Sequence, residues 1–305
     1  MSILVVGSVA FDTVKTPFGE GVEVLGGSAT HFSVSASFWT PVRLVAVVGE
    51  DFTEEHRRPL IDHKVDLGGL IAAKGRTFRW VGEYGDDLNS AKTIDTQLNV
   101  FAEFRPVVPE AWRETPVLFL ANIDPDLQWD VLGQVHGAKL VAADTMNFWI
   151  DQKPEALKKL LTRVRLLLIN DGEIRQLTGE RNLVRAATIV RSWGPEAVVV
   201  KRGEHGVLVL DGAGGHGFAL PAFPVPQVMD PTGAGDAFAG GFLGFLASRG
   251  VDGPLDLRRA AVAGSVMASF QVEDFSLERL RRLTKPEIHD RYERFRELTR
   301  FEPLG

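Results

Sequence analysis

The sequence predicts an α/β fold in which a mostly parallel sheet is covered by helices. Short apolar runs rich in β-branched residues recur along the chain, and most are followed by a segment with the apolar spacing of a helix. This alternation of strands and helices is typical of a parallel sheet. It is interrupted once, by two segments whose apolar residues alternate. With 305 residues, the chain is long enough for one large α/β unit or two smaller domains.

Seven runs are predicted to be buried strands because they are short and continuously apolar. They span residues 3–7, 44–49, 117–121, 140–144, 166–170, 197–201 and 207–210. Helical spacing follows several of them: Ile174 and Leu177 precede a stop at Gly179, and phenylalanines recur every three or four residues after Asp236. The charged segment after Ser276 is expected to form an outer helix.

The interruption of this pattern predicts a hairpin that stands off the main sheet. Phe78, Trp80 and Tyr84 share one parity, as a strand with one covered face requires. Turn residues follow at positions 85–87, and a second alternation runs from 94 to 100. The pattern fits equally well a plain edge hairpin and a lid that covers a site and offers aromatic surface to a ligand or a second subunit.

Composition excludes several classes of protein. The 34 basic and 40 acidic residues give a net charge of −6, which argues against non-specific binding to nucleic acid or anionic membranes. The uncharged stretches are shorter than the ~18 residues of a spanning helix, and the amino terminus does not read as a signal peptide, so a cytoplasmic protein is expected. The absence of Cys excludes disulfides and thiolate zinc sites, and the seven His residues lack zinc-ligand spacing.

The strongest local signal is the string Asp-Pro-Thr-Gly-Ala-Gly-Asp at positions 230–236, followed by a helical run. The amides of Gly233, Ala234 and Gly235 lie where a starting helix leaves its donors unpaired, so they and the positive helix end can hold an anion. Asp236 lies in the first turn, where the same field favours its ionised form, and can accept a proton from a hydroxyl that attacks phosphorus. The alternatives are a capping carboxylate and glycines that only permit close helix packing.

Other nucleotide-binding and catalytic motifs are missing. The chain has no Gly-x-x-x-x-Gly-Lys-Ser/Thr string, which excludes a P-loop protein. The first strand is not followed by a complete dinucleotide fingerprint, which argues against a dehydrogenase, and no Gly-x-Ser-x-Gly elbow occurs.

The string at 230–236, with the Ala-Phe-Ala-Gly-Gly that follows it, resembles the carboxy-terminal signature of the ribokinase (PfkB) family of sugar and nucleoside kinases. The resemblance covers nearly the whole chain and includes an early strand ending in Asp12, Gly26-Gly27 before a helix, Asn170-Asp171-Gly172-Glu173, and Lys201-Arg202-Gly203. It implies a single domain over residues 1–305, with helices on both faces of the sheet and a small β lid formed by about residues 11–25 and 76–101. It also implies an ATP-dependent kinase in which Asp236 is the general base and the amides of residues 233–235 form the anion hole.

The resemblance also implies roles for further residues. The positions matching the substrate site are Asp12, Gly26, Gly27, His31, Asp144 and Asn147. Those matching the nucleotide site are Asn170, Glu173, Lys201, Gly203 and Thr232, of which Asn170 and Glu173 would hold Mg²⁺ through water. Asp230 and Thr232 match the start of a loop that binds a monovalent cation such as K⁺ in many relatives, although Val272 falls where a glycine is usual.

Two departures from the family pattern concern the acceptor. His31 replaces a common Asn, and Ser28 stands where a ribokinase typically has Lys. The expected substrate is therefore a small polyol whose class stays open among sugars, nucleosides and cyclitols. The alternatives are a catalytically silent sensor of the same fold and a phosphosugar kinase, for which Arg76 or Arg79 could supply the extra cation. The protein is expected to be a monomer or a lid-mediated homodimer.

Overall fold

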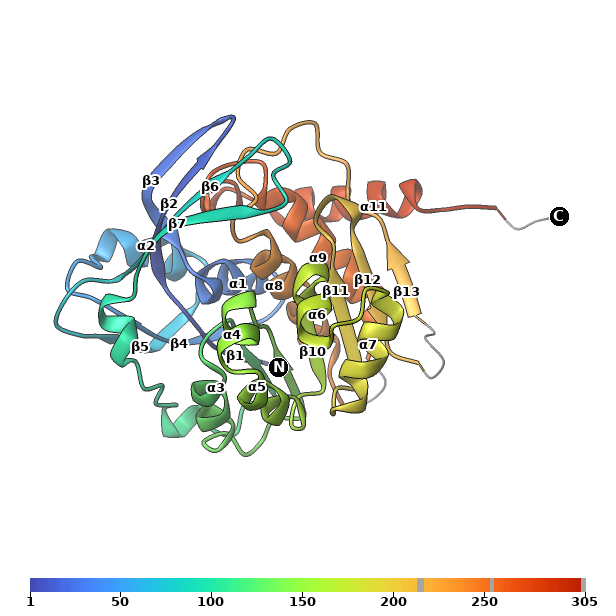
Figure 1. Cartoon of the computed structure of the whole chain (residues 1–305). Coiled ribbons are helices and arrows are strands. Elements are labelled where there is room, and N and C mark those ends of the chain that lie inside the picture. Colours follow the sequence, from blue (N-terminus) through green and yellow to red (C-terminus); the bar gives the residue numbers. More distant parts are fainter. Residues whose placement is uncertain (213–216, 253–254, 303–305) are drawn as a thin grey trace.

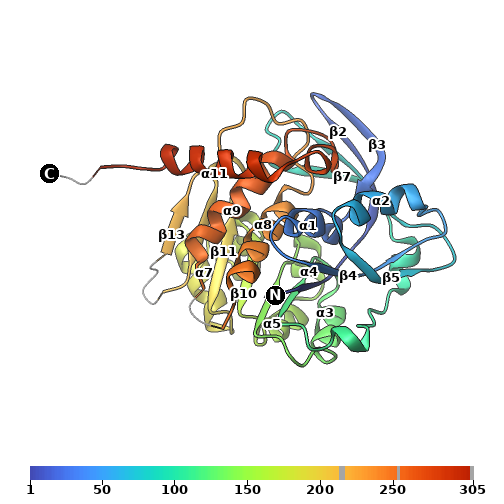
Figure 2. The same ribbon diagram turned by 180° about the vertical axis from the view of Figure 1, so that it is seen from behind.

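The computed structural model describes residues 1–212, 217–252 and 255–302. A nine-stranded sheet runs through the molecule with helices on both faces (Figures 1 and 2). The six pairings from β11 to the edge strand β5 are parallel, and the pairings of β12 with β11 and of β13 with β12 are antiparallel. The predicted fold class is therefore confirmed. From one edge to the other the strands are β13 (Gly217–Leu220), β12 (Val207–Leu210), β11 (Ala197–Lys201), β10 (Leu166–Asn170), β9 (Leu140–Ala143), β8 (Val117–Leu120), β1 (Ile3–Val6), β4 (Val42–Val48) and β5 (Asp66–Ala72).

Each face of the large sheet has its own core because successive residues of a buried strand point to opposite sides. In β1, Ile3 and Val5 belong to one apolar cluster and Leu4 and Val6 to the other. The first face is covered by α1 (Ser28–Ser37), α2 (Glu54–Asp62), α8 (Ala234–Arg249), α9 (Leu257–Gln271), α10 (Glu278–Arg281) and α11 (Lys285–Leu298), most of which lie in front in Figure 2. The second face is covered by α3 (Pro125–Leu132), α4 (Asn147–Gln152), α5 (Pro154–Leu161), α6 (Asp171–Thr178) and α7 (Leu183–Ser192).

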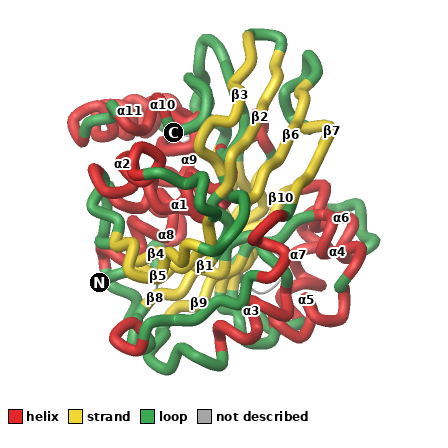
Figure 3. The backbone as a smooth tube through the Cα atoms, turned by 90° about the vertical axis from the view of Figure 1, so that its left-hand side faces the viewer, coloured by secondary structure: helices red, strands yellow, loops and turns green. Residues whose placement is uncertain are grey.

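A second, four-stranded sheet stands off the large one (Figure 3). Its order is β3 (Gly19–Gly26), β2 (Ala10–Thr16), β6 (Phe78–Tyr84) and β7 (Ala91–Gln97). The predicted hairpin is confirmed by the antiparallel pairing of β6 with β7, and the parallel pairing of β2 with β6 joins the two predicted segments. A short 3₁₀ segment, η1 (Asn99–Glu103), leads back to the main body.

The structure also corrects the expected elements. The early strand does not end in Asp12 as expected: Asp12 lies inside β2, which continues to Thr16, and the pairing with β3 shifts register between Asp12 and Val14. The edge strands β5 and β13 were not predicted, since β5 contains Gly68 and Gly69 and β13 is only four residues long. The charged tail is helical as expected. Among the described residues, no helix combines the length and hydropathy needed to cross a membrane.

Candidate active site

The chemistry-bearing residues collect where the carboxyl ends of neighbouring strands meet the start of α8. Asp144 follows β9, Asn170 ends β10, and Lys201 ends β11 directly opposite Asn170 in the strand register. Parallel strands end at the same edge of a sheet, so these side chains lie together although they are far apart in sequence.

The glycine turn before α8 is held in a conformation that requires glycine. Gly233 has φ 73°, and a Cβ placed there would lie 2.4 Å from Cγ of the buried His31. No hydrogen-bond partner within the described part of the chain takes the amides of Gly233, Gly235 or Asp236. Ala234 differs from the expectation, because its N–H donates to the Pro231 carbonyl at 3.2 Å. The free donors of the turn are therefore Gly233 and Gly235, together with Asp236.

The glycines that follow the turn serve helix packing. Gly240 lets α8 approach α1 so closely that a Cβ would lie 2.5 Å from the Phe32 carbonyl, and Gly241 does the same toward α9. The Ser35 hydroxyl donates to the Ala237 carbonyl at 2.6 Å and fixes the two helices at the level of the turn. The packing alternative thus explains the later glycines, while the free amides of the turn are left for another use.

A buried ion pair lies against the turn. The Lys201 ammonium is 2.7 Å from Oδ2 of Asp144, whose side chain is 5% exposed. A Cβ on Gly235 would lie 3.2 Å from the same Nζ. The charges of Asp144, Glu173 and Asp236 raise the pKa of Lys201 and outweigh the opposing effect of its burial, so the side chain is a cation at neutral pH. A positive charge is thus fixed beside the free amides.

The carboxyl group of Asp236 sits in a strongly acidic environment. Burial raises its pKa from 3.8 to about 8, with smaller contributions from Asp144 and Asp12 and an opposing one from Lys201. The helix field favours the ionised form, as expected, but in the free protein desolvation and neighbouring carboxylates outweigh it and raise the pKa. The residue nevertheless keeps some accessible surface, so a substrate can reach it.

Asn170 and Glu173 form a capping box at the start of α6. The Asn170 amide donates to Oε2 of Glu173 at 2.9 Å, and the Glu173 amide donates to Oδ1 of Asn170 at 2.7 Å. Oε1 of Glu173 is left over, and burial with the nearby charge of Asp144 raises the pKa of this carboxyl to about 7. No cluster of three or more metal-ligating side chains occurs in the described part of the chain. One oxygen ligand in a region of negative potential fits Mg²⁺ that keeps most of its waters and binds phosphate oxygens, rather than a cation caged by protein.

Asp12, in β2, is near enough to Asp236 for its charge to raise the pKa of that carboxyl. Its carboxylate packs on Gly26, where a Cβ would overlap Oδ2 at 1.9 Å. Burial raises the pKa of Asp12 to about 7, and the Gly27 amide partly offsets this. Gly27 itself has φ 95° and caps α1, so the Gly-Gly pair is needed both for its backbone and for contact with Asp12. Ser28 is buried and paired with Ser8, with their hydroxyls 3.1 Å apart.

The small sheet reaches over this site at two points. Thr232 donates its hydroxyl to Oη of Tyr84 at 3.3 Å, and burial raises the pKa of Tyr84 to about 12 with contributions from three carboxylates of the site. Asn89, in the turn between β6 and β7, donates to Glu204 at 3.0 Å, beside Gly203. Tyr84 was recognised in sequence only as part of an alternating strand. The contacts of Tyr84 and Asn89 together show that the hairpin touches both the glycine turn and the loop after β11.

Two residues expected in the substrate site, His31 and Asn147, lie outside the cluster of buried charged side chains. His31 is 1% exposed and supports Gly233 from behind, and burial lowers its pKa to about 4, so the ring is neutral. Asn147 is the exposed first residue of α4, and its side chain accepts the Phe148 amide, which leaves it apart from the buried cluster.

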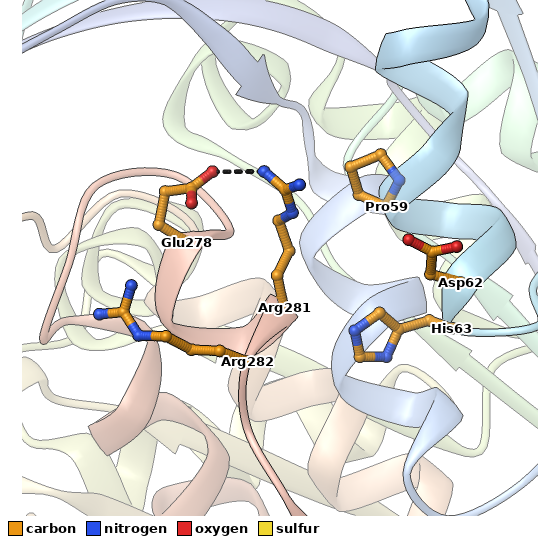
Figure 4. A pocket seen from close by; sticks show the side chains of 6 residues that line it. All are labelled: Pro59, Asp62, His63, Glu278, Arg281 and Arg282. Carbon is orange, nitrogen blue, oxygen red and sulfur yellow. Dashed lines mark hydrogen bonds and ion pairs between the residues drawn. The ribbon is translucent and has the colours of Figure 1, made fainter.

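Two cavities lie away from this cluster. One of about 270 Å³ lies between the end of α2 and α10 and is lined by Pro59, Asp62, His63, Glu278, Arg281 and Arg282, with Arg281 paired with Glu278 at 2.7 Å (Figure 4). Another of about 520 Å³ lies beside η1 and includes Lys74, Arg76 and Arg105. Neither is lined by residues of the glycine turn, so neither marks the site where the strand ends converge.

Comparison with known proteins gives consistent results. The sequence model of the pfkB family carbohydrate kinases matches residues 2–279. The cytidine kinase of Thermococcus kodakarensis is 32% identical over 251 residues, covering 80% of this chain and 87% of the relative.

Solved structures agree with the fold. The nucleoside kinase of Methanocaldococcus jannaschii, an archaeal member of the ribokinase family, superposes with a TM-score of 0.76 at 21% identity and covers 96% of this chain and 98% of the other. A putative ribokinase II from E. coli in complex with ATP and Mg²⁺ gives a TM-score of 0.77 at 17% identity, covering 96% and 99% of the two chains.

Proposed function

The chain belongs to the pfkB family of carbohydrate kinases, and on this basis we propose that it transfers the γ-phosphoryl group of ATP to a hydroxyl of a small polyol, with a nucleoside as the favoured acceptor. One observation carries the proposal. The free amides of the turn before α8, the Lys201 ammonium and the Asp236 carboxyl meet at one edge of the sheet. An anion cradle, a cation and a base side by side are what phosphoryl transfer needs.

Asp236 takes the proton in this scheme. The acceptor oxygen attacks the γ-phosphorus, its O–P bond forms while the bond to the leaving ADP oxygen breaks, and the hydroxyl proton passes to the ionised Asp236. A carboxyl whose pKa is about 8 is a stronger base than an exposed aspartate, and its pKa lies near the working pH. Binding of a cation nearby favours the ionised form that the reaction requires.

The migrating group is held by the chain's own donors. The amides of Gly233 and Gly235 bind its oxygens, and Ala234 contributes through the shape of the turn. Lys201 lies close enough to Gly235 to contact the same oxygens and is the charge that offsets those of Asp144, Glu173 and Asp236. Mg²⁺, held through water near Glu173 and Asn170, would neutralise the nucleotide phosphates. Gly203 and Thr232 border the nucleotide, and the contact of Asn89 with Glu204 supports closure of the hairpin over it.

The acceptor lies between Asp12 and Asp236 in this proposal. Asp12 can accept hydrogen bonds from two neighbouring hydroxyls, and the amides at Gly26 and Gly27 border the same space. A nucleoside is favoured because the cytidine kinase of T. kodakarensis is 32% identical over most of both chains. His31 acts through Gly233 rather than on the acceptor, since its ring is buried behind the turn. Asn147 stays a weaker candidate for this role.

A phosphosugar acceptor is less well supported. Arg79 is already paired with Asp51 at 2.9 Å and with Glu23 at 2.8 Å, so it is not available for a second phosphate. Arg76 is exposed and lines the cavity beside η1. The sensor alternative is opposed by the intact turn and base.

The acceptor is identified by measuring ATP consumption by the purified protein with cytidine, other nucleosides, pentoses, hexoses, inositols and sugar phosphates. We expect a nucleoside to give the highest rate, at least about tenfold above the rate with ATP alone. Consumption only with a sugar phosphate would establish the phosphosugar alternative. Thermal stabilisation by an acceptor without ATP consumption would indicate a sensor and overturn the proposed activity.

A further inference from the structure

The loop that precedes the glycine turn is packed against the loop after α9. Asp230 is fully buried, and its carboxylate accepts the Thr232 amide at 2.8 Å and the Ser276 amide at 3.3 Å. The Met229 amide donates to the Val272 carbonyl at 2.7 Å. This is the loop in which the family resemblance leads one to expect a monovalent cation beside Asp230 and Thr232.

The Gln271 side chain lies between the loop before the glycine turn and the loop after α9. Gln271, the last residue of α9, is fully buried, and its Nε2 donates to the Thr232 carbonyl at 3.1 Å and to the Ser276 carbonyl at 2.6 Å. A primary amide has two N–H donors, and both are used here. The nitrogen therefore lies between two inward-facing oxygens, where a cation shared by those oxygens would have to sit.

The other oxygens of this loop that could bind a cation also accept hydrogen bonds from protein donors. Both carboxylate oxygens of Asp230 accept backbone amides, and Val272 accepts Met229. Ser276 has φ 54°, a strained value for a serine, and its hydroxyl donates to the Leu25 carbonyl. The loop is thus held in the shape that directs the Ser276 carbonyl at Gln271. The two backbone amides therefore already engage both oxygens with which Asp230 would bind a cation.

We propose that the Gln271 amide fills the place of the monovalent cation, so that the glycine turn of this kinase is organised without K⁺. The Thr232 carbonyl is one residue before Gly233, and its bond to Gln271 fixes the turn whose amides face the phosphate. In this proposal a neutral bridge, the two hydrogen bonds from Gln271 to the Thr232 and Ser276 carbonyls, takes the place of the expected K⁺. The activity readout of this inference rests on the proposed function, whereas the thermal readout below does not.

The first experiment compares the wild-type protein in 100 mM chloride salts of K⁺, Na⁺ and tetramethylammonium. Ligands that bind only the native state raise its melting temperature, so a filled cation site is visible without any substrate. We expect melting temperatures within about 1 °C of one another and, with the acceptor found above, rates within about twofold. A K⁺-specific rise of about 3 °C or more, or a tenfold stimulation of the rate by K⁺, would overturn the proposal.

The second experiment removes the bridge. Gln271→Ala takes away both donors and leaves room between the two carbonyls, and Gln134→Ala is its matched control. Gln134 likewise donates to two carbonyls, those of Pro106 at 2.9 Å and Asp130 at 3.3 Å, but far from the turn. We expect Gln271→Ala to lose thermal stability and to regain part of it in K⁺ only, whereas the loss in Gln134→Ala is equal in all three salts.

Equal melting temperatures of Gln271→Ala in all three salts would show that these carbonyls do not form a cation site. That result would refute the proposal that the Gln271 amide takes the place of a cation. If Gln271→Ala does not fold in any salt, Gln271→Met, which keeps the volume and removes the two donors together with the Oε1 acceptor, replaces it. The wild-type comparison stands independently of both variants. Since the thermal measurements use no acceptor, an inactive protein would contradict the proposed function and leave this inference testable.

Discussion

Replacing Asp236 with Asn is expected to lower kcat by roughly 10²–10⁴ while the affinity for ATP changes little. Asn has the size of the carboxyl group but cannot accept the proton of the attacking hydroxyl. The measurement is steady-state turnover of wild type and variant with the acceptor identified above, together with nucleotide binding by calorimetry. An Asn variant that turns over as fast as wild type would remove Asp236 as the base.

The same variant separates chemistry from folding. The folded-state pKa of Asp236, about 8, lies above its ordinary 3.8, so the folded protein holds a proton that the unfolded chain releases between these values. Its contribution to stability is complete below about pH 4 and is lost as the pH rises toward 8. The Asn variant, which has no such group, is expected to melt a few degrees higher than wild type at pH 8 and to differ less at pH 5. A variant that loses both activity and stability would indicate a structural defect instead.

Replacing Lys201 with Met is expected to lower kcat by about 10²–10³, because the charge beside Gly235 is lost where negative charge develops on the migrating group. Turnover and KM for ATP are measured together. A rise in KM with unchanged kcat would show that Lys201 only helps to bind the nucleotide.

A control is needed because the substitution leaves Asp144 buried without its partner. Breaking such a pair commonly costs about 3–5 kcal/mol. The double variant Lys201→Met with Asp144→Asn removes both charges, so its melting temperature should recover while kcat stays low. Lys201→Arg keeps the charge and should retain part of the activity. Full recovery of turnover in the double variant would mean that Lys201 serves stability alone.

Much of the fold was predictable because its strands are fully buried. Residues 166–170 and 197–201 are continuously apolar up to their last residue, as central strands covered on both faces must be. The edge strands β5 and β13 escaped prediction because one side of each has no neighbour and burial imposes less pattern there. The predicted strand end at Asp12 was wrong because β2 continues to Thr16, and the segment before it, residues 7–9, is buried and has no turn motif that would mark where β2 begins.

The site was predictable only where chemistry depends on consecutive residues. The turn at 230–236 is local, so its free amides and adjoining carboxyl follow from the sequence pattern. The ionisation of Asp236 is not local, because its pKa depends first on burial and then on the charges of Asp144, Lys201, Asp12 and Glu173, which the fold brings near. The roles of Tyr84 and Gln271 were not predicted because a tyrosine in a strand and a glutamine at a helix end carry no motif, and these roles appear only through contacts with Thr232.

The central claim is that the turn before α8 binds the migrating phosphoryl group while Asp236 receives the acceptor proton. A crystal structure with ADP, aluminium fluoride and the acceptor tests it most directly. The account predicts fluoride atoms within about 3.2 Å of the Gly233 and Gly235 amides and an acceptor hydroxyl at a similar distance from the Asp236 carboxylate. A fluoride bound away from these amides, or an acceptor hydroxyl out of reach of Asp236, would contradict it.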